Sequence, residues 1–148
     1  MDLQAVSDKL EIHELLARYA RGVDLKDWEL WKSVFTDDAI IDYSSANCPV
    51  GPRDEMAAWL EQGLGKAPMT QHFITNIEVD LDGDRASVHA MFYNPMLLPG
   101  MADQTYCGGY YHHDVVRTAE GWKSEHLVEE NLWMVNSPRD AMSAADAS

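Results

Sequence analysis

TQHFITNIEVDLDGDRASVHAMFYN, residues 70–94, is the stretch in which the chain changes from a helical to an extended pattern. β-Branched and aromatic residues are frequent in it, and LDGDR at 81–85 carries the Asp-Gly signal of a tight hairpin. Extended segments follow, separated by a Glu-Gly turn, while two prolines and a glycine in 94–103 predict a longer loop. The predicted antiparallel strands cover residues 70–81, 85–94, 103–118 and 121–135.

The chain before Pro68 is predominantly helical. Apolar residues recur at helical spacing in residues 4–22, 26–35 and 51–65, and AIIDY at 39–43 predicts a strand. Helices followed by a run of antiparallel strands indicate an α+β fold, with the N-terminal helices packed on one face of a strongly curved sheet. Such an arrangement makes a cone, whose interior suits a small-molecule site.

Composition limits the partners of the protein. The 148 residues are the size of one domain, which we expect over 4–136, followed by a small, polar and flexible tail at 137–148. The composition, 46% hydrophobic and 24% charged, is that of a folded protein. A net charge of −14 argues against nucleic acid and against an anionic membrane surface, because both would repel the chain.

The cysteines and the N-terminus favour a reducing compartment. Cys48 and Cys107 are far apart and in no metal-like spacing, so two separate thiols are expected. Neither a secretory signal nor a membrane-spanning stretch is apparent, which makes a cytoplasmic protein the default expectation. No set of histidines and carboxylates has a recognised metal spacing, and we predict no metal.

Several short sequence motifs occur along the chain in an order that resembles one known family. EIHELLARYARGVDLKDWELWKSVFTDDAIIDY, residues 11–43, resembles the opening of the SnoaL-like, NTF2-like proteins. DLKDW at 24–28, IDY at 41–43 and TQHFI at 70–74 look like scytalone dehydratase, and residues 108–123 resemble the late hairpin of the same superfamily. The resemblance implies a cone-shaped α+β barrel without metal or cofactor that forms a homo-oligomer, either a trimer or a dimer.

The resemblance also implies a His–Asp pair. In the dehydratase and dehydrochlorinase branches an aspartate after the first helix pairs with a histidine on the first long strand, and the matching residues here are Asp24 and His72. Imidazole can remove a proton near neutral pH, and a carboxylate on its other nitrogen would fix the tautomer. The alternatives are a structural His72 and an Asp24 that caps the next helix. Strand alternation would place Ile74 and Asn76 on the same face as His72.

Two tyrosines are further catalytic candidates. Tyr43 ends IDY, whose tyrosine faces the pocket in scytalone dehydratase, and Tyr19 lies where a bile-acid dehydratase has a functional tyrosine. A phenol can donate a hydrogen bond to a substrate oxygen. The alternative for Tyr19 is packing in the helical core.

The late strands supply candidates for substrate binding. Alternation puts Tyr111 and His113 on one face and His112 on the other, so either histidine could face the interior. The second catalytic histidine of scytalone dehydratase falls on Gly109 here and does not transfer. Asn131 and Trp133 keep that family's spacing from Trp122, although core packing is the alternative for Trp133. Phe92 and nearby methionines would form an apolar mouth or a subunit interface. The predicted substrate-binding residues are Phe92, Tyr111, His112, His113, Asn131 and Trp133.

These predictions combine into one hypothesis, a cofactor-independent lyase acting on a small hydrophobic molecule, aromatic or polycyclic. It would remove water or another small fragment such as formaldehyde or halide. One rival is a ketosteroid-type isomerase, whose carboxylate base would be Asp24 or Asp42. The other is a non-catalytic subunit or binding module like the β-subunits of ring-hydroxylating dioxygenases, because this fold carries many functions.

Overall fold

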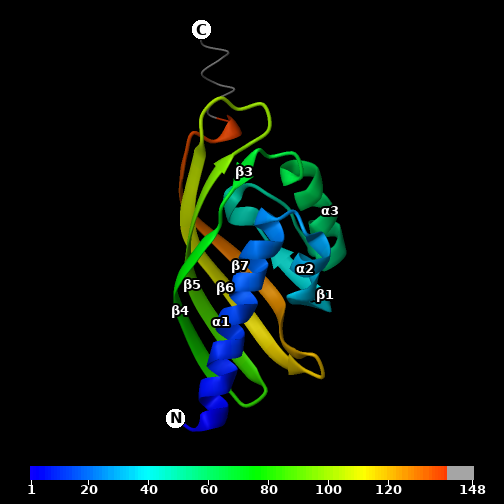
Figure 1. Ribbon diagram of the computed structural model, residues 1–148, viewed down its shortest axis with the longest axis vertical. Coiled ribbons are helices and arrows are strands. Elements are labelled where there is room, and N and C mark those ends of the chain that lie inside the picture. The colour runs from blue at the N-terminus through cyan, green and yellow to red at the C-terminus, as the bar shows by residue number, and fades with distance from the viewer. Residues whose placement is uncertain (140–148) are drawn as a thin grey trace.

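Three α-helices cover one face of a curled seven-stranded sheet in the computed structural model, which describes residues 1–139 (Figure 1). The helices are α1 (Leu3–Asp24), α2 (Trp28–Ser33) and α3 (Arg53–Leu64), with a short 3-10 helix η1 (Ser44–Ala46). The strands are β1 (Phe35–Asp42), β2 (Val50–Pro52), β3 (Met69–Thr70), β4 (Phe73–Asp82), β5 (Arg85–Leu97), β6 (Thr105–Thr118) and β7 (Gly121–Val135). The predicted α+β fold with a mainly antiparallel sheet is confirmed.

The sheet has the order β2-β1-β7-β6-β5-β3, and β4 also pairs with β5. All of these pairs are antiparallel except β1 with β7, which run parallel with Ile41 opposite Leu127. The long strands β4 to β7 curl around α1, so that the inner face of the sheet packs against this helix (Figure 1). The interior of the cone therefore lies between α1 and the concave face of the sheet.

Helix α1 forms the centre of the core because its apolar residues recur on one side. Ile12, Leu15, Leu16, Tyr19 and Val23 are all buried, whereas its other side is charged and exposed. The helix begins at an N-cap, Asp2, whose side chain accepts a hydrogen bond from Ala5 N at 2.8 Å.

The crossing of α1 and α2 depends on Gly22. A Cβ atom there would lie 2.8 Å from Trp31 N, so only glycine permits this approach. Asp27 is the N-cap of α2 and accepts from Leu30 N at 3.0 Å. The alternative role of Asp24 as that cap is therefore excluded, and its carboxylate is available elsewhere.

An ion pair fixes the first half of α1 to the β6–β7 hairpin. The guanidinium of Arg117 donates to both oxygens of Asp8, at 2.9 and 2.8 Å, and Trp122 Nε1 donates to Oδ1 at 3.1 Å. Arg117 also lies over the Trp122 ring, 4.7 Å from its centroid. The buried Asp8 carboxylate is thus fully partnered.

Three local predictions were wrong. Strand β5 continues to Leu97, since Asn94–Met96 pair with β6, so the loop predicted at 94–103 is shorter. His72 lies between β3 and β4 rather than within a strand. A register shift between Thr75 and Glu78, with Asn76 at φ 50°, breaks the predicted alternation and leaves Asn76 exposed. Of the tail predicted to be flexible, residues 140–148 lie outside the described residues.

Candidate active site

His72 and Asp24 are in direct contact at the end of α1. His72 Nδ1 lies 2.7 Å from Asp24 Oδ1, and the backbone N–H of His72 donates to Oδ2 at 2.8 Å. Thr70 donates its hydroxyl to Oδ1 at 3.1 Å and accepts from Lys26 Nζ at 2.8 Å. The carboxylate is thus held by the segment that joins β3 to β4.

The environment of Asp24 keeps it ionised. Burial would raise its pKa, but the hydrogen bonds and the charge of His72 outweigh burial, and the pKa is lowered. An ionised carboxylate only accepts hydrogen bonds, so His72 Nδ1 carries a proton directed at Asp24, and in the neutral form of the ring Nε2 carries the lone pair. Nε2 makes no hydrogen bond to another residue among 1–139. The ring is therefore oriented with a free basic nitrogen.

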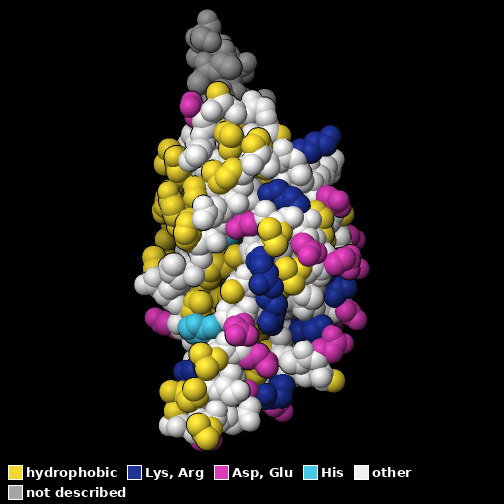
Figure 2. Space-filling model, viewed as in Figure 1, with side chains coloured by type: hydrophobic (Ala, Val, Ile, Leu, Met, Phe, Trp, Pro, Cys, Tyr) yellow, Lys and Arg dark blue, Asp and Glu magenta, His cyan; other side chains and the backbone are white. Residues whose placement is uncertain are grey.

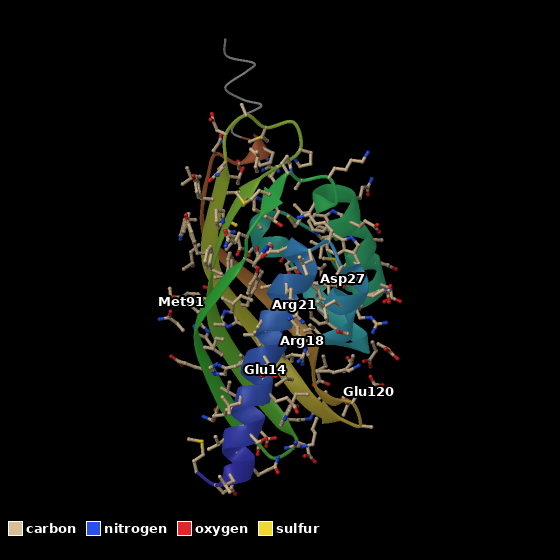
Figure 3. All side chains as sticks on the ribbon, viewed as in Figure 1. Glu14, Arg18, Arg21, Asp27, Met91 and Glu120 are labelled. Atoms are coloured by element: carbon tan, nitrogen blue, oxygen red, sulfur yellow. The ribbon has the colours of Figure 1, made fainter. Side chains whose placement is uncertain are left out.

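A groove of about 490 Å³ between α1 and β4 reaches this pair. Its lining is mainly apolar, and hydrophobic side chains beside the basic side chains of α1 mark this side of the molecule in Figure 2. Arg21 lies along the exposed side of α1 in Figure 3. The lining residues are His13, Ala17, Ala20, Arg21, Asp24, Leu25, Gln71, His72, Phe73, Ile74 and Ile77.

Tyr19 and Tyr43 meet inside the cone. Their hydroxyl oxygens are 2.6 Å apart, and both side chains are buried. The Tyr19 ring packs edge-on against Tyr111, with centroids 5.3 Å apart. Burial raises the pKa of both Tyr19 and Tyr43, so both phenols stay protonated and can donate hydrogen bonds.

His113 is the inward-facing histidine of β6. Its Nδ1 lies 2.9 Å from Ser124 Oγ, and since Ser124 donates to His126 O at 3.2 Å, Nδ1 must be the donor to Ser124. Burial, and then the charges of His112 and His126, lowers the pKa of His113 to about 3. His113 is therefore neutral, and its buried Nε2 has no partner among the described residues.

The other predicted binding residues divide between the two faces of the sheet. Phe92 and Tyr111 stack on the inner face with centroids 4.4 Å apart, and Asn131 pairs with Gly109 on the same face. His112 lies on the outer face, where its Nε2 contacts Glu130 at 2.8 Å. His112 therefore does not join the interior cluster.

Trp133 also lies on the outer face, with 43% of its surface exposed. A bulge between Gly108 and Gly109 inserts Leu132 into β7, so Trp133, two residues after the inward Asn131, points outward. Its indole covers Gly108, where a Cβ would lie 2.4 Å from the ring. The prediction that Trp133 binds substrate together with Asn131 is wrong, because the bulge interrupts the alternation of side chains along β7.

The sequence analysis did not identify Glu129, which also lies on the inner face. Glu129 is opposite Tyr111 in the β6–β7 register and alternates with buried Leu127 and inward Asn131. Burial raises the pKa of Glu129 to about 7, and the nearby Asn131 side chain lowers it by a smaller amount. Alternation along the strand could have identified Glu129, because it places Glu129 on the same face as the apolar Leu127. An acidic residue on an inward face is uncommon.

The fold agrees with the comparisons with known proteins. The sequence profile of the SnoaL-like domain matches residues 4–128, so the chain belongs to the SnoaL-like domain family. The resemblance found in the sequence is thereby confirmed for family and fold. Within residues 1–139, no helix has the length and apolarity needed to cross a membrane, and no cluster of three or more side chains could hold a metal ion.

Proteins from three organisms are similar to this chain. The Mycobacterium tuberculosis protein Rv2910c is 37% identical over 87% of this chain and 88% of its own length. Kfla4162 from Kribbella flavida is 33% identical, with a TM-score of 0.82 over 89% of this chain and 95% of its own. A hexachlorocyclohexane dehydrochlorinase, LinA-type3 from Novosphingobium barchaimii, is 17% identical, with a TM-score of 0.80 over 91% and 93%. At that identity the last comparison establishes the fold alone.

Proposed function

We propose that the protein is a cofactor-independent lyase that removes water or another small fragment from a small hydrophobic molecule, aromatic or polycyclic. The observation that carries this proposal is the His72–Asp24 pair, whose 2.7 Å contact leaves Nε2 as a free base. An enzyme that performs elimination, the dehydrochlorinase from Novosphingobium barchaimii, has the same fold.

The mechanism begins with proton removal by His72 Nε2 from a carbon next to an activating group. Asp24 stabilises the imidazolium that forms, because it stays ionised and accepts from Nδ1. The phenols of Tyr19 and Tyr43 would donate to an oxygen of the substrate that gains negative charge. The electron pair of the broken C–H bond then forms the double bond as the leaving group departs with the electron pair of its own bond to carbon. A departing hydroxide takes the proton from His72 and leaves as water, whereas a halide leaves as the anion and His72 releases its proton to solvent.

The test is a His72→Gln variant assayed with hydroxylated and halogenated aromatic and alicyclic compounds. Turnover should fall at least about 100-fold, the usual effect of losing a general base. The matched control is His126→Gln, since His126 is an exposed histidine outside the pair, and its turnover should be unchanged. Retained turnover in His72→Gln would contradict the assignment. Loss of water or halide lowers the product mass, whereas a product that keeps the substrate mass in H2O and gains deuterium in D2O would indicate an isomerase.

We further propose that the protein is a homo-oligomer assembled through the outer face of the sheet. Phe73, Met91, Tyr93 and Trp133 are each at least 40% exposed there, and a large apolar patch of this kind is typical of an interface. Met91 projects outward from the sheet in Figure 3. Light scattering on the purified chain tests the proposal, and a monomer at micromolar concentration would refute it.

We also propose that the protein is located in the cytoplasm. Cys48 and Cys107 are both free thiols in the structure, which suits a reducing environment. Fractionation of the native cells checks this, since recovery outside the cytoplasm would refute it.

A further inference from the structure

The most unusual titratable group inside the cone is Glu129. Its place on the inner face is fixed by Ser45, whose hydroxyl donates to Glu129 O at 2.6 Å and accepts from Asn131 N at 2.8 Å. These bonds tie η1 to β7 and hold the backbone where the two side chains turn inward. Glu129 is therefore positioned by the fold and does not belong to a loose segment.

The neighbours of Glu129 are uncharged. Burial raises the pKa of Tyr19, Tyr43 and Tyr111, and the negative charge of Glu129 raises the pKa of each phenol further. The thiols of Cys48 and Cys107 respond in the same way. Glu129 is half-buried, and among residues 1–139 no lysine or arginine forms an ion pair with it, which is uncommon for an acid withdrawn from solvent in a folded protein.

Glu129 is also the only group in this cluster that changes charge near neutral pH. Burial holds the pKa values of the three phenols and the two thiols above their ordinary values, and the pKa of His113 is far below neutral. The pKa of Glu129 itself is about 7. Because His72 belongs to the same proposed site and histidines also change charge in this range, a change of binding between about pH 6 and about pH 8 reports on Glu129 only if it is lost in Glu129→Gln.

Two further buried polar atoms of the inner face lack partners. Asn94 is 3% exposed and gives its Nδ2 to the Tyr111 hydroxyl at 3.2 Å, which leaves the acceptor Oδ1 unpaired. The buried Nδ2 of Asn131 makes no hydrogen bond of normal geometry and lies beside the Glu129 carboxyl, whose pKa it lowers. Buried polar atoms are nearly always hydrogen-bonded in proteins, so an acceptor and a donor without partners indicate a ligand that supplies both functions. A hydroxyl group does so.

We propose that protonated Glu129 donates a hydrogen bond to an uncharged, hydroxylated aromatic or alicyclic ligand, with Asn131 and Asn94 as the further partners of its oxygen functions. The proposal rests on the proposed function for the statement that this ligand is the substrate. It assigns Glu129 the selection of a neutral ligand, because an ionised Glu129 would repel an anion and would no longer donate. Glu129 is then a specificity-determining residue of the same site.

The test is calorimetric binding of 2-naphthol, an uncharged probe in this range, at about pH 6 and about pH 8. If only the protonated form binds, the affinity of the unaltered protein should fall about tenfold over this interval, following the protonated fraction of a group with a pKa of about 7. Glu129→Gln keeps a neutral donor, so it should bind with no pH dependence. Glu130→Gln is the matched control, because Glu130 is the adjacent residue, exposed on the outer face, and should behave as the unaltered protein.

Several results would overturn the proposal. They are no binding of 2-naphthol, an affinity independent of pH in the unaltered protein, and an unchanged pH dependence in Glu129→Gln. Tighter binding of protonated 2-naphthylmethylamine than of 2-naphthol at the higher pH would also overturn it, since the ionised carboxylate would then pair with a cation. The binding measurement needs no turnover, so a failure here is distinct from a failure of the lyase assignment.

Discussion

Two acidic side chains, Asp8 of α1 and Glu129 of β7, are withdrawn from solvent in opposite ways. The hydrogen bonds of Arg117 lower the pKa of Asp8 to about 2, whereas burial without a cation raises the pKa of Glu129 to about 7. The first is a structural anchor at the N-terminal half of α1, and the second lies among phenols on the inner face. The fold pairs the buried carboxylate of Asp8 completely where it anchors α1, and leaves the half-buried Glu129 without a lysine or arginine partner among residues 1–139 on the inner face, where we propose that a ligand binds.

The largest effect should come from removing the anchor. Asp8→Ala leaves Arg117 and Trp122 Nε1 without their buried acceptor, and we expect a loss of about 3 kcal/mol in the free energy of unfolding. Urea denaturation followed by circular dichroism measures it. Because the pKa of Asp8 is depressed in the folded state, its contribution is present above its unfolded pKa near 4 and is lost as the pH falls toward 2.

The matched control is Asp84→Ala, which removes the other carboxylate bound to Arg117. Asp84 is 80% exposed, so this change should cost less than about 1 kcal/mol. Equal losses in the two variants would show that burial of Asp8 adds nothing to the ion pair.

Glu129→Gln should give a smaller change of opposite sign. The folded pKa of Glu129 exceeds its ordinary value of 4.5, so the unfolded chain ionises first as the pH rises, and stability falls between about pH 4.5 and about pH 7. The pKa difference sets an upper limit of about 3 kcal/mol, which partial exposure reduces to about 2 kcal/mol. The variant should therefore exceed the unaltered protein in stability at about pH 8 and match it near pH 4.

Thermal unfolding at these two pH values measures the difference. Glu130→Gln should change stability by no more than about 0.5 kcal/mol at either pH, because Glu130 is exposed. A Glu129→Gln variant that is less stable at about pH 8 would show that the carboxylate has a stabilising partner and would break the contrast with Asp8.

Local patterns in the sequence were sufficient for the helices and the hairpins. The helical spacing of apolar residues in 4–22, among them Leu15, Leu16 and Tyr19, predicted α1, and Asp-Gly and Glu-Gly predicted the turns after β4 and β6. Each of these signals lies within a few residues of the structure that it determines. The parallel pairing of β1 with β7 could not be predicted from the sequence, because no local pattern in either strand identifies the distant strand with which it pairs.

The candidate site was predictable only in part. The contact between Asp24 and His72 came from a resemblance, because no local pattern joins residues so far apart in the chain. Trp133 was placed on the wrong face because the bulge at Gly108 and Gly109 depends on the pairing of β6 with β7. Glu129 was overlooked because it is one of 25 acidic residues, and its place opposite Tyr111 depends on the pairing of β6 with β7.

The anchor between Asp8 and Arg117 joins residues that are 109 positions apart. Strand β1 likewise pairs with β7, which is synthesised much later. A ribosome therefore releases α1 and β1 long before their partners exist. During most of synthesis the apolar side of α1 has no sheet to cover, so this segment is a natural client for a chaperone. Folding is completed late, when the last hairpin arrives, and the long sequence separation of these contacts predicts that it is slow for a chain of this size.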